Sequence, residues 1–94
     1  MKTQKNPKRV IIQPVVVGLP AVAAKTQFFV DGKMVLELPP PAQFDHIAQG
    51  VMYKRELTKA GFSHVRWSWT GGQDVSKGYC HHELSAFPPI GTAQ

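Results

Sequence analysis

The densest run of chemically capable side chains in this 94-residue sequence is Cys80-His81-His82-Glu83. A thiolate and imidazole nitrogens are ligands of structural zinc, and a cysteine beside a histidine can become a nucleophile. On an extended strand, however, Cys80 and His82 share one face while His81 and Glu83 share the other. At most two of these side chains can therefore aim at one ion, and a cysteine and the next histidine point apart.

Other catalytic or metal-binding groupings lack a motif. His46 or His64 would have to complete a four-ligand zinc site, without the spaced ligand pairs that such sites use. A small ribonuclease could combine proton transfer with phosphate charge through His64, Arg66, Lys54, Arg55 and His82. No serine elbow, phosphate loop or cofactor signature is present. We predict no catalytic residue, no metal and no cofactor, and keep a small ribonuclease or toxin as a third hypothesis.

Trp67 and Trp69, with Arg66 beside them, admit two interpretations. In a core, they supply much of the apolar area that a small sheet needs. On a surface, two aromatic rings on one sheet face beside an arginine could stack nucleic-acid bases. The core interpretation is favoured, because a domain this small cannot readily expose both rings.

The positive charge is concentrated at the beginning of the chain. The net charge is +5, and the whole excess lies in residues 1–25, while residues 26–94 are neutral. Such a segment attracts phosphates or an acidic protein surface, or it keeps a neighbouring hydrophobic strand soluble. For a nucleic-acid-binding protein, the expected contacts are Lys2, Lys5, Lys8, Arg9, Lys25, Arg66, Trp67 and Trp69.

These side chains must be positioned by strands and a helix, the first of which is a strand at residues 9–17. Its β-branched runs favour a strand, with Pro14 at an edge or bulge because proline cannot donate to a ladder. The alternative is a secretory signal peptide, since an Ala-Val-Ala-Ala site at 21–24 follows the basic and apolar residues. The helix of such a signal would be broken by Gln13, Pro14, Gly18 and Pro20.

An Asp-Gly pair after Val30 predicts a tight hairpin between strands at 25–30 and 33–38. Two registers remain open. A two-residue loop pairs Val30 with Lys33, and a three-residue loop pairs Phe29 with Lys33. The expected core face of the second strand carries Met34, Leu36 and Leu38.

Helical spacing runs from Ala42 to Ala60, after three prolines that stop the preceding strand. Gly61 is predicted to end the helix in a left-handed conformation. Gly50 indicates a close contact, because glycine costs ~1 kcal/mol relative to alanine inside a helix. The expected core stripe is Phe44, Ile47, Ala48 and Val51, with Leu57 towards its edge.

The outer face of this helix is solvated by default, but it also has the chemistry of a binding surface. Its residues are predicted to be Gln49, Tyr53, Lys54, Arg55, Glu56 and Lys59. The predicted contacts with a protein partner are Tyr53, Lys54, Arg55 and Arg66.

Beyond the helix, residues 63–70 alternate as a half-buried strand, residues 71–74 form a turn and residues 77–84 form a weaker strand. The order β-β-β-α-β-β predicts an α+β fold, in which an antiparallel sheet of four to five strands has one helix packed across it. We divide the chain into a basic N-terminal arm at 1–8, a single α+β domain at 9–85 and an extended C-terminal tail at 86–94.

Length and composition restrict the classes of function. One cysteine permits no intrachain disulfide and is typical of a reducing cytoplasm. No stretch reaches the ~20 apolar residues of a membrane span. We therefore expect a cytoplasmic, non-catalytic protein that binds the surface of a larger protein or ribonucleoprotein complex, and a homodimer stays open. In size and character alone, such chains are like accessory proteins of phages and mobile elements, including inhibitors of host machinery such as anti-CRISPR proteins. The alternative is a nucleic-acid-binding protein that uses the basic arm.

Overall fold

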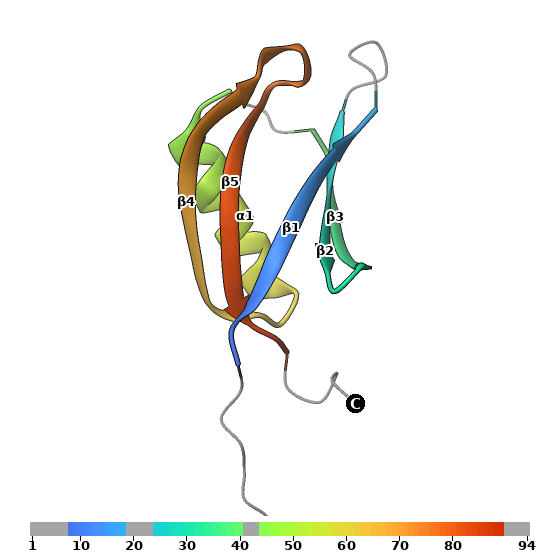
Figure 1. Ribbon diagram of the computed structural model, residues 1–94, viewed down its shortest axis with the longest axis vertical. Helices are drawn as coiled ribbons and strands as arrows, with labels where there is room; N and C mark the ends of the chain where they lie inside the picture. The colour runs from blue at the N-terminus through green and yellow to red at the C-terminus, as the bar shows by residue number, and fades with distance from the viewer. Residues whose placement is uncertain (1–7, 19–23, 41–43, 90–94) are drawn as a thin grey trace, which may run out of the picture.

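The protein is described by a computed structural model over residues 8–18, 24–40 and 44–89. Its strands form one five-stranded antiparallel sheet in the order β3-β2-β1-β5-β4, and helix α1 packs across one face of it (Figure 1). The predicted α+β fold and element order are confirmed. The elements are β1 Val10–Val17, β2 Lys25–Val30, β3 Lys33–Leu38, α1 His46–Lys59, β4 Ser63–Asp74, the short 3-10 helix η2 Val75–Lys77 and β5 Tyr79–Phe87.

Several predicted boundaries differ from the observed ones. The turn predicted at 71–74 is wrong, because β4 continues through it with a register shift between Trp69 and Gln73, and the chain reverses at η2. β5 ends at Phe87, beyond its predicted end. The helix predicted from Ala42 begins only at His46, after the extended N-cap Asp45, so its predicted start is wrong for residues 44 and 45. The predictions that lie outside the described residues concern Lys2, Lys5, most of the 21–24 site and the end of the tail.

The central strand β1 changes partners along its length. Its first residues pair with β5, from Val10 opposite Ala86 to Ile12 opposite Leu84. Its later residues, Gln13–Val17, pair with β2 instead. β5 meanwhile stays paired with β4 as far as Tyr79, so β1 and β5 diverge and the sheet forks (Figure 1).

Pro14 lies where the two strands part. Extending the first register by two residues would place Pro14 opposite His82. Every second residue of a strand directs its N–H and C=O to the same side. The N–H of Cys80 points away from β4, because it donates to α1. His82 is two residues further along β5, so its backbone groups also point away from β4 and towards β1, where proline has no N–H to donate. The edge or bulge position predicted for Pro14 is wrong, because β1 is a central strand and its register with β2 is regular. Pro14 instead ends the pairing of β1 with β5.

A buried side chain of α1 replaces part of the missing ladder. Gln49 is 1% exposed, so its predicted place on the outer face is wrong. Its Oε1 accepts the N–H of Cys80, and its Nε2 donates to the C=O of Gly78, both at 2.9 Å. A side-chain amide offers the same donor and acceptor as a peptide group. Gln49 thus satisfies backbone groups of β5 that would otherwise be buried without a partner strand.

α1 buries the opposite face from the predicted one. Its buried residues are Gln49, Gly50, Tyr53 and Leu57. The predicted core stripe is wrong, since Ala48 is half-buried and the other three are exposed, Phe44 at 43%, Ile47 at 55% and Val51 at 51%.

The physical reason lies in the next turn of the helix. The two faces are roughly 140° apart, and the Ile47–Val51 face continues into Lys54 and Arg55. Burying that face would strip water from two cations at a large cost in free energy. The face of Tyr53 and Leu57 carries no such charge.

Gly50 allows Trp67 of β4 to lie directly against the helix. A Cβ at position 50 would fall 2.5 Å from Cε2 and Cε3 of Trp67. The predicted close contact at Gly50 is confirmed. Trp67 packs against the hydrophobic core, as the core interpretation predicted. The same interpretation is wrong for Trp69, which is 37% exposed.

α1 ends in a Schellman motif. The N–H of Phe62 donates to the C=O of Leu57 and the N–H of Gly61 to the C=O of Thr58, both at 3.0 Å. Gly61 has φ +109°, which confirms its predicted role. At the other end, Asp45 caps α1 by accepting the N–H of Ala48 at 2.8 Å.

The β2–β3 hairpin has the two-residue loop. Val30 pairs with Lys33, and Asp31 and Gly32 take φ values of +51° and +80°, as a tight turn between twisted strands requires.

Further along the hairpin, the ladder steps from Phe28 opposite Leu36 to Phe29 opposite Met34, which leaves Val35 as an extra residue in β3. This bulge turns Met34 away from the face of Leu36. The predicted core face is therefore correct for Leu38, which is 6% exposed, and wrong for Met34, which is 52% exposed.

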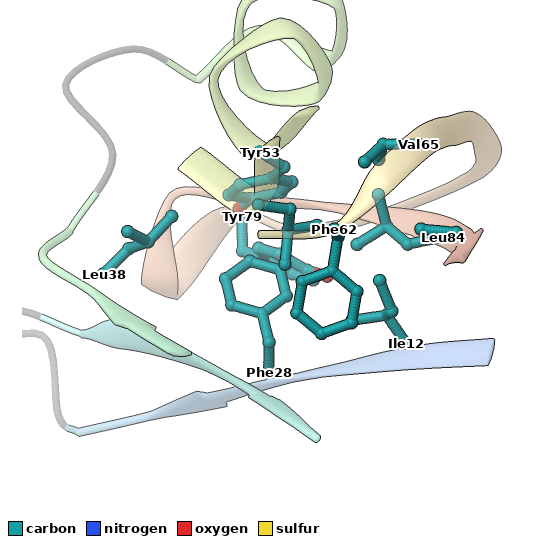
Figure 2. Packing of buried hydrophobic residues seen from close by; sticks show 10 residues of the cluster. Ile12, Phe28, Leu38, Tyr53, Phe62, Val65, Tyr79 and Leu84 are labelled. Atoms are coloured by element: carbon teal, nitrogen blue, oxygen red, sulfur yellow. The ribbon is translucent and has the colours of Figure 1, made fainter. Parts of the chain in front are cut away.

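The core lies between α1 and the two arms of the fork. Figure 2 shows Tyr53 of α1 and Phe28 of β2 pointing toward each other, with ring centroids 5.1 Å apart in an edge-on contact. The cluster of buried apolar residues comprises Ile12, Phe28, Leu38, Tyr53, Leu57, Phe62, Val65, Tyr79, Leu84 and Ala86.

Replacing Gly50 with alanine should destabilise the protein. In an exposed helix position, Gly→Ala stabilises by ~1 kcal/mol. At position 50, the new methyl group meets the Trp67 ring, and overpacking costs about 1–3 kcal/mol. Urea unfolding would measure the change, with Lys54→Ala on the exposed face as a control that shifts stability by less than about 0.5 kcal/mol. A more stable Gly50→Ala variant would contradict this packing.

Gly61→Val should destabilise by more than about 1 kcal/mol, because a β-branched residue resists a positive φ. An added Cβ would also lie 3.0 Å from Cβ of Pro89. Gly71→Val is the matched control, since Gly71 has φ +93° with nothing within 4 Å of its added Cβ. Thermal denaturation should show the greater loss for Gly61→Val, and an unchanged melting temperature would refute the role given to Gly61.

Candidate functional site

The outer face of α1 presents a line of exposed apolar side chains. Ile47 and Val51, four residues apart, lie on one side of α1, and both are more than 40% exposed, as is Phe44, which precedes the N-cap Asp45. Lys54 and Arg55, both exposed, continue this side by one turn. We call these five residues the α1 outer surface.

The charge of this surface is positive at its C-terminal end. The nearby carboxylate of Glu56 has Oε2 at 3.4 Å from Nε of Arg55 and 3.5 Å from Nζ of Lys59. Exposed pairs of this kind contribute little stability. Within the described ranges, no carboxylate lies within ion-pair distance of Lys54, so this part of the surface offers unneutralised positive charge.

Tyr53, a predicted partner contact, is 0% exposed and does not reach the surface. It follows Gln49 by one helical turn, so both side chains point to the core. Its hydroxyl donates to Oε1 of Gln49 at 3.5 Å. The prediction of an exposed Tyr53 is wrong, whereas the predicted exposure of Lys54 and Arg55 is confirmed.

Arg66 is exposed, but it does not join the α1 outer surface. It alternates along β4 with Val65 and Trp67, which face the core, and therefore points away from the helix. There it borders a groove of about 550 Å³, beside the fork, whose lining also includes Ile11 and Glu83. The predicted partner-binding set is thus divided between two faces of the sheet.

Two of the predicted nucleic-acid contacts are engaged within the protein. Arg9 donates to the C=O of His64 at 2.7 Å and lies over the ring of Phe87, 4.8 Å from its centroid. Lys25 lies 3.5 Å from the carboxylate of Glu37. Lys8 is exposed.

Trp67 and Trp69 do not form a platform with Arg66. Trp67 lies against Gly50 of the helix. Trp69 stacks on His46 of α1 with ring centroids 4.1 Å apart and donates from Nε1 to the C=O of Gly72 at 3.1 Å. Both rings are on the helix side of the sheet, whereas the Arg66 side chain points to the other side, although Trp67 also lines the groove that Arg66 borders.

Residues 80–83 alternate as the sequence predicted. Cys80 and His82 are buried, and His81 and Glu83 are exposed. Burial raises the pKa of the Cys80 thiol, and the charge of Asp45 raises it further, which opposes thiolate chemistry. Among residues 8–18, 24–40 and 44–89, no group of three histidine, cysteine or acidic side chains is placed to hold a metal ion.

The two tyrosines of the chain are both buried. Burial raises the pKa of Tyr53 well above its ordinary value and raises the pKa of Tyr79 to about 12. Ionising either ring inside the core would leave a phenolate without water.

No family model, curated protein or solved structure matches this chain. In the part of the chain that the structure describes, no helix is long and apolar enough to cross a membrane.

Alkaline titration should reveal the buried tyrosines. The protein favours the protonated phenols, so their stabilisation is complete below the pKa of an unfolded tyrosine, near 10, and is lost as the pH rises through the higher native values. Tyrosinate absorbance should therefore appear only together with loss of the folded circular-dichroism signal. Ionisation of a tyrosine near pH 10 in the folded protein would contradict the observed burial.

Proposed function

We propose that this protein is a non-catalytic binding protein that attaches to a larger protein through the α1 outer surface. The observation that carries the proposal is the exposure of Ile47 and Val51 on a helix whose opposite face is already packed, with the exposed Phe44 just before its N-cap. Exposed apolar side chains that line up and are bordered by charge are typical of interaction sites.

The charges of the surface define the chemistry of the partner. Lys54 and Arg55 follow the apolar line, so a complementary surface combines apolar side chains with carboxylates at one end. Three apolar side chains cover much less than the ~800 Å² per partner of a standard interface. The partner therefore also contacts residues around the line. A chain of this kind can block a larger assembly by occupying its surface, which requires no catalytic group.

Nucleic-acid binding through the basic arm is the weaker proposal. Arg9 and Lys25 already contact groups of the protein itself, and the two tryptophans lie on the helix side of the sheet. The cations that remain for phosphates in this proposal are Lys2, Lys5, Lys8 and Arg66. No observed feature supports the ribonuclease hypothesis.

Site-specific photo-crosslinking in the native host would test the preferred function. A photoreactive residue at position 51 should capture a partner that the same residue at position 11, on the other face, does not capture. Ile47→Asp should reduce the captured amount at least tenfold while leaving the fold intact, because Ile47 is 55% exposed. The matched control, Ile11→Asp, replaces a side chain that is 71% exposed and should leave capture unchanged. Equal capture from both positions, or no effect of Ile47→Asp, would refute the proposal.

Salt dependence would distinguish the weaker proposal. With Arg9 and Lys25 engaged internally, the three lysines of the arm and Arg66 give a logarithmic salt slope no steeper than about −3.6 on duplex DNA, at ~0.9 per phosphate. Deleting residues 1–8 should then reduce the slope to about −0.9. Tight binding that persists at about 200 mM salt and depends on Trp67 or Trp69 would place nucleic-acid binding first.

A further inference from the structure

The face of the sheet opposite α1 carries two charged side chains on neighbouring strands. Arg66 of β4 lies opposite Ser85 of β5. One step of the alternation further along, Ser68 lies opposite Glu83. Residues paired across two strands point to the same face, so the four side chains form a square. Its two charges stand on one diagonal and its two serines on the other.

The two charges of this square are not neutralised within the chain. Over the residues that the structure describes, no ion pair joins Arg66 or Glu83 to each other or to any other residue. Both are exposed. Arg9, a further cation at this face, donates to the C=O of His64 at 2.7 Å and to Oγ of Ser85 at 3.4 Å, so it already has partners. Arg66 and Glu83 are therefore available to the charges of a second molecule.

This arrangement of charge is complementary to itself. A homodimer with a two-fold axis uses the same patch on both copies, so a contact from one residue to another is always accompanied by its reverse. An axis that runs along the sheet face, midway between Arg66 and Glu83, places each of them opposite the other residue of the second copy. Two Arg–Glu pairs then form, with the planar guanidinium matched to a carboxylate.

The same axis passes the most exposed apolar side chain of the sheet, Ile11, which is 71% exposed. Ile11 of β1 pairs with Ser85 and so stands in one row with Ser85 and Arg66. In a regular sheet, with strands ~4.8 Å apart and roughly 6.8 Å between alternate residues, this axis runs within about 2 Å of the backbone at Ile11 and at both serines. Ile11 therefore meets Ile11 of the second copy, and the small serine side chains let the two sheets approach.

We infer that this protein forms a two-fold homodimer through the sheet face opposite α1, held by two Arg66–Glu83 pairs and by contact between the two Ile11 side chains. The interface covers the groove beside the fork, which is lined by all five residues of this patch. The patch is small relative to the ~800 Å² per partner of a standard interface, so the dimer is reversible. Both α1 outer surfaces stay exposed, and each binds its own partner. That binding rests on the proposed function, whereas the dimer does not.

Sedimentation equilibrium of the full chain, from about 10 μM to about 1 mM, would test the dimer. The weight-average mass should rise from the 10.4 kDa of one chain by at least about 1.5-fold at the highest concentration, which corresponds to a dissociation constant of about 1 mM or lower. The mass of a single chain at every concentration would overturn the inference.

Charge reversal tests the two pairs directly. Arg66→Glu, or Glu83→Arg, brings like charges together twice in each dimer and should weaken association at least about 100-fold. An equal mixture of these two variants restores both Arg–Glu pairs and should dimerise again. Lys54→Glu, on α1, is the matched control and should leave the mass unchanged. Single variants that associate like the unaltered protein, or a mixture that stays monomeric, would contradict the proposed pairs.

Photo-crosslinking of the purified protein at about 1 mM gives a second measurement. A photoreactive residue at position 11 should link the chain to a second copy, and the same residue at position 51 should not. Self-linkage from position 51 alone would overturn the inference. Failure to capture a host partner through position 51 would refute the proposed function and leave the dimer unaffected.

Discussion

The missing amide proton of Pro14 determines much of this structure. β1 can pair with β5 only up to Ile12 and then continues with β2 alone. The side of β5 facing the fork is left with buried backbone groups, which must find partners elsewhere. Gln49 and His82 supply them, the first from α1 and the second from β5 itself.

The orientation of α1 follows from the same constraint. Gln49 reaches the N–H of Cys80 only when its side of the helix faces the sheet. That rotation brings Gly50 against Trp67 and Tyr53 into the core. It also turns Ile47 and Val51 outward. The exposed apolar line is thus a consequence of how the fork is closed.

Features encoded by neighbouring residues were predictable from the sequence. The element order, the hairpin, the role of Gly61, the close contact at Gly50 and the alternation of residues 80–83 all depend on local spacing. The buried face of α1 was not predictable in this way. α1 has two candidate faces, and the choice between them depends on a fork formed by residues far apart in the chain. A glutamine and a tyrosine one turn apart, next to the single glycine of the helix, were the signal for the correct face.

The candidate site was predictable in its charges and not in its geometry. Lys54 and Arg55 are exposed, as their residue types indicate, because cations stay hydrated. Arg66 is exposed on the other side of the sheet, since strand alternation alone does not show which face the helix covers. The apolar part of the α1 outer surface had been assigned to the core. The extra residue Val35 likewise had no local signal, and Met34 was therefore assigned to the wrong face.

The two outer strands of the sheet have a consequence for the behaviour of the protein at high concentration. β3 contains the bulge at Val35, and three prolines follow the strand directly in the sequence. β4, at the other edge, has two register shifts against β5. Bulged edges are poor templates for intermolecular β-pairing, the first step towards fibrils. The protein can therefore expose the apolar side chains of the α1 outer surface while its sheet resists edge-to-edge aggregation.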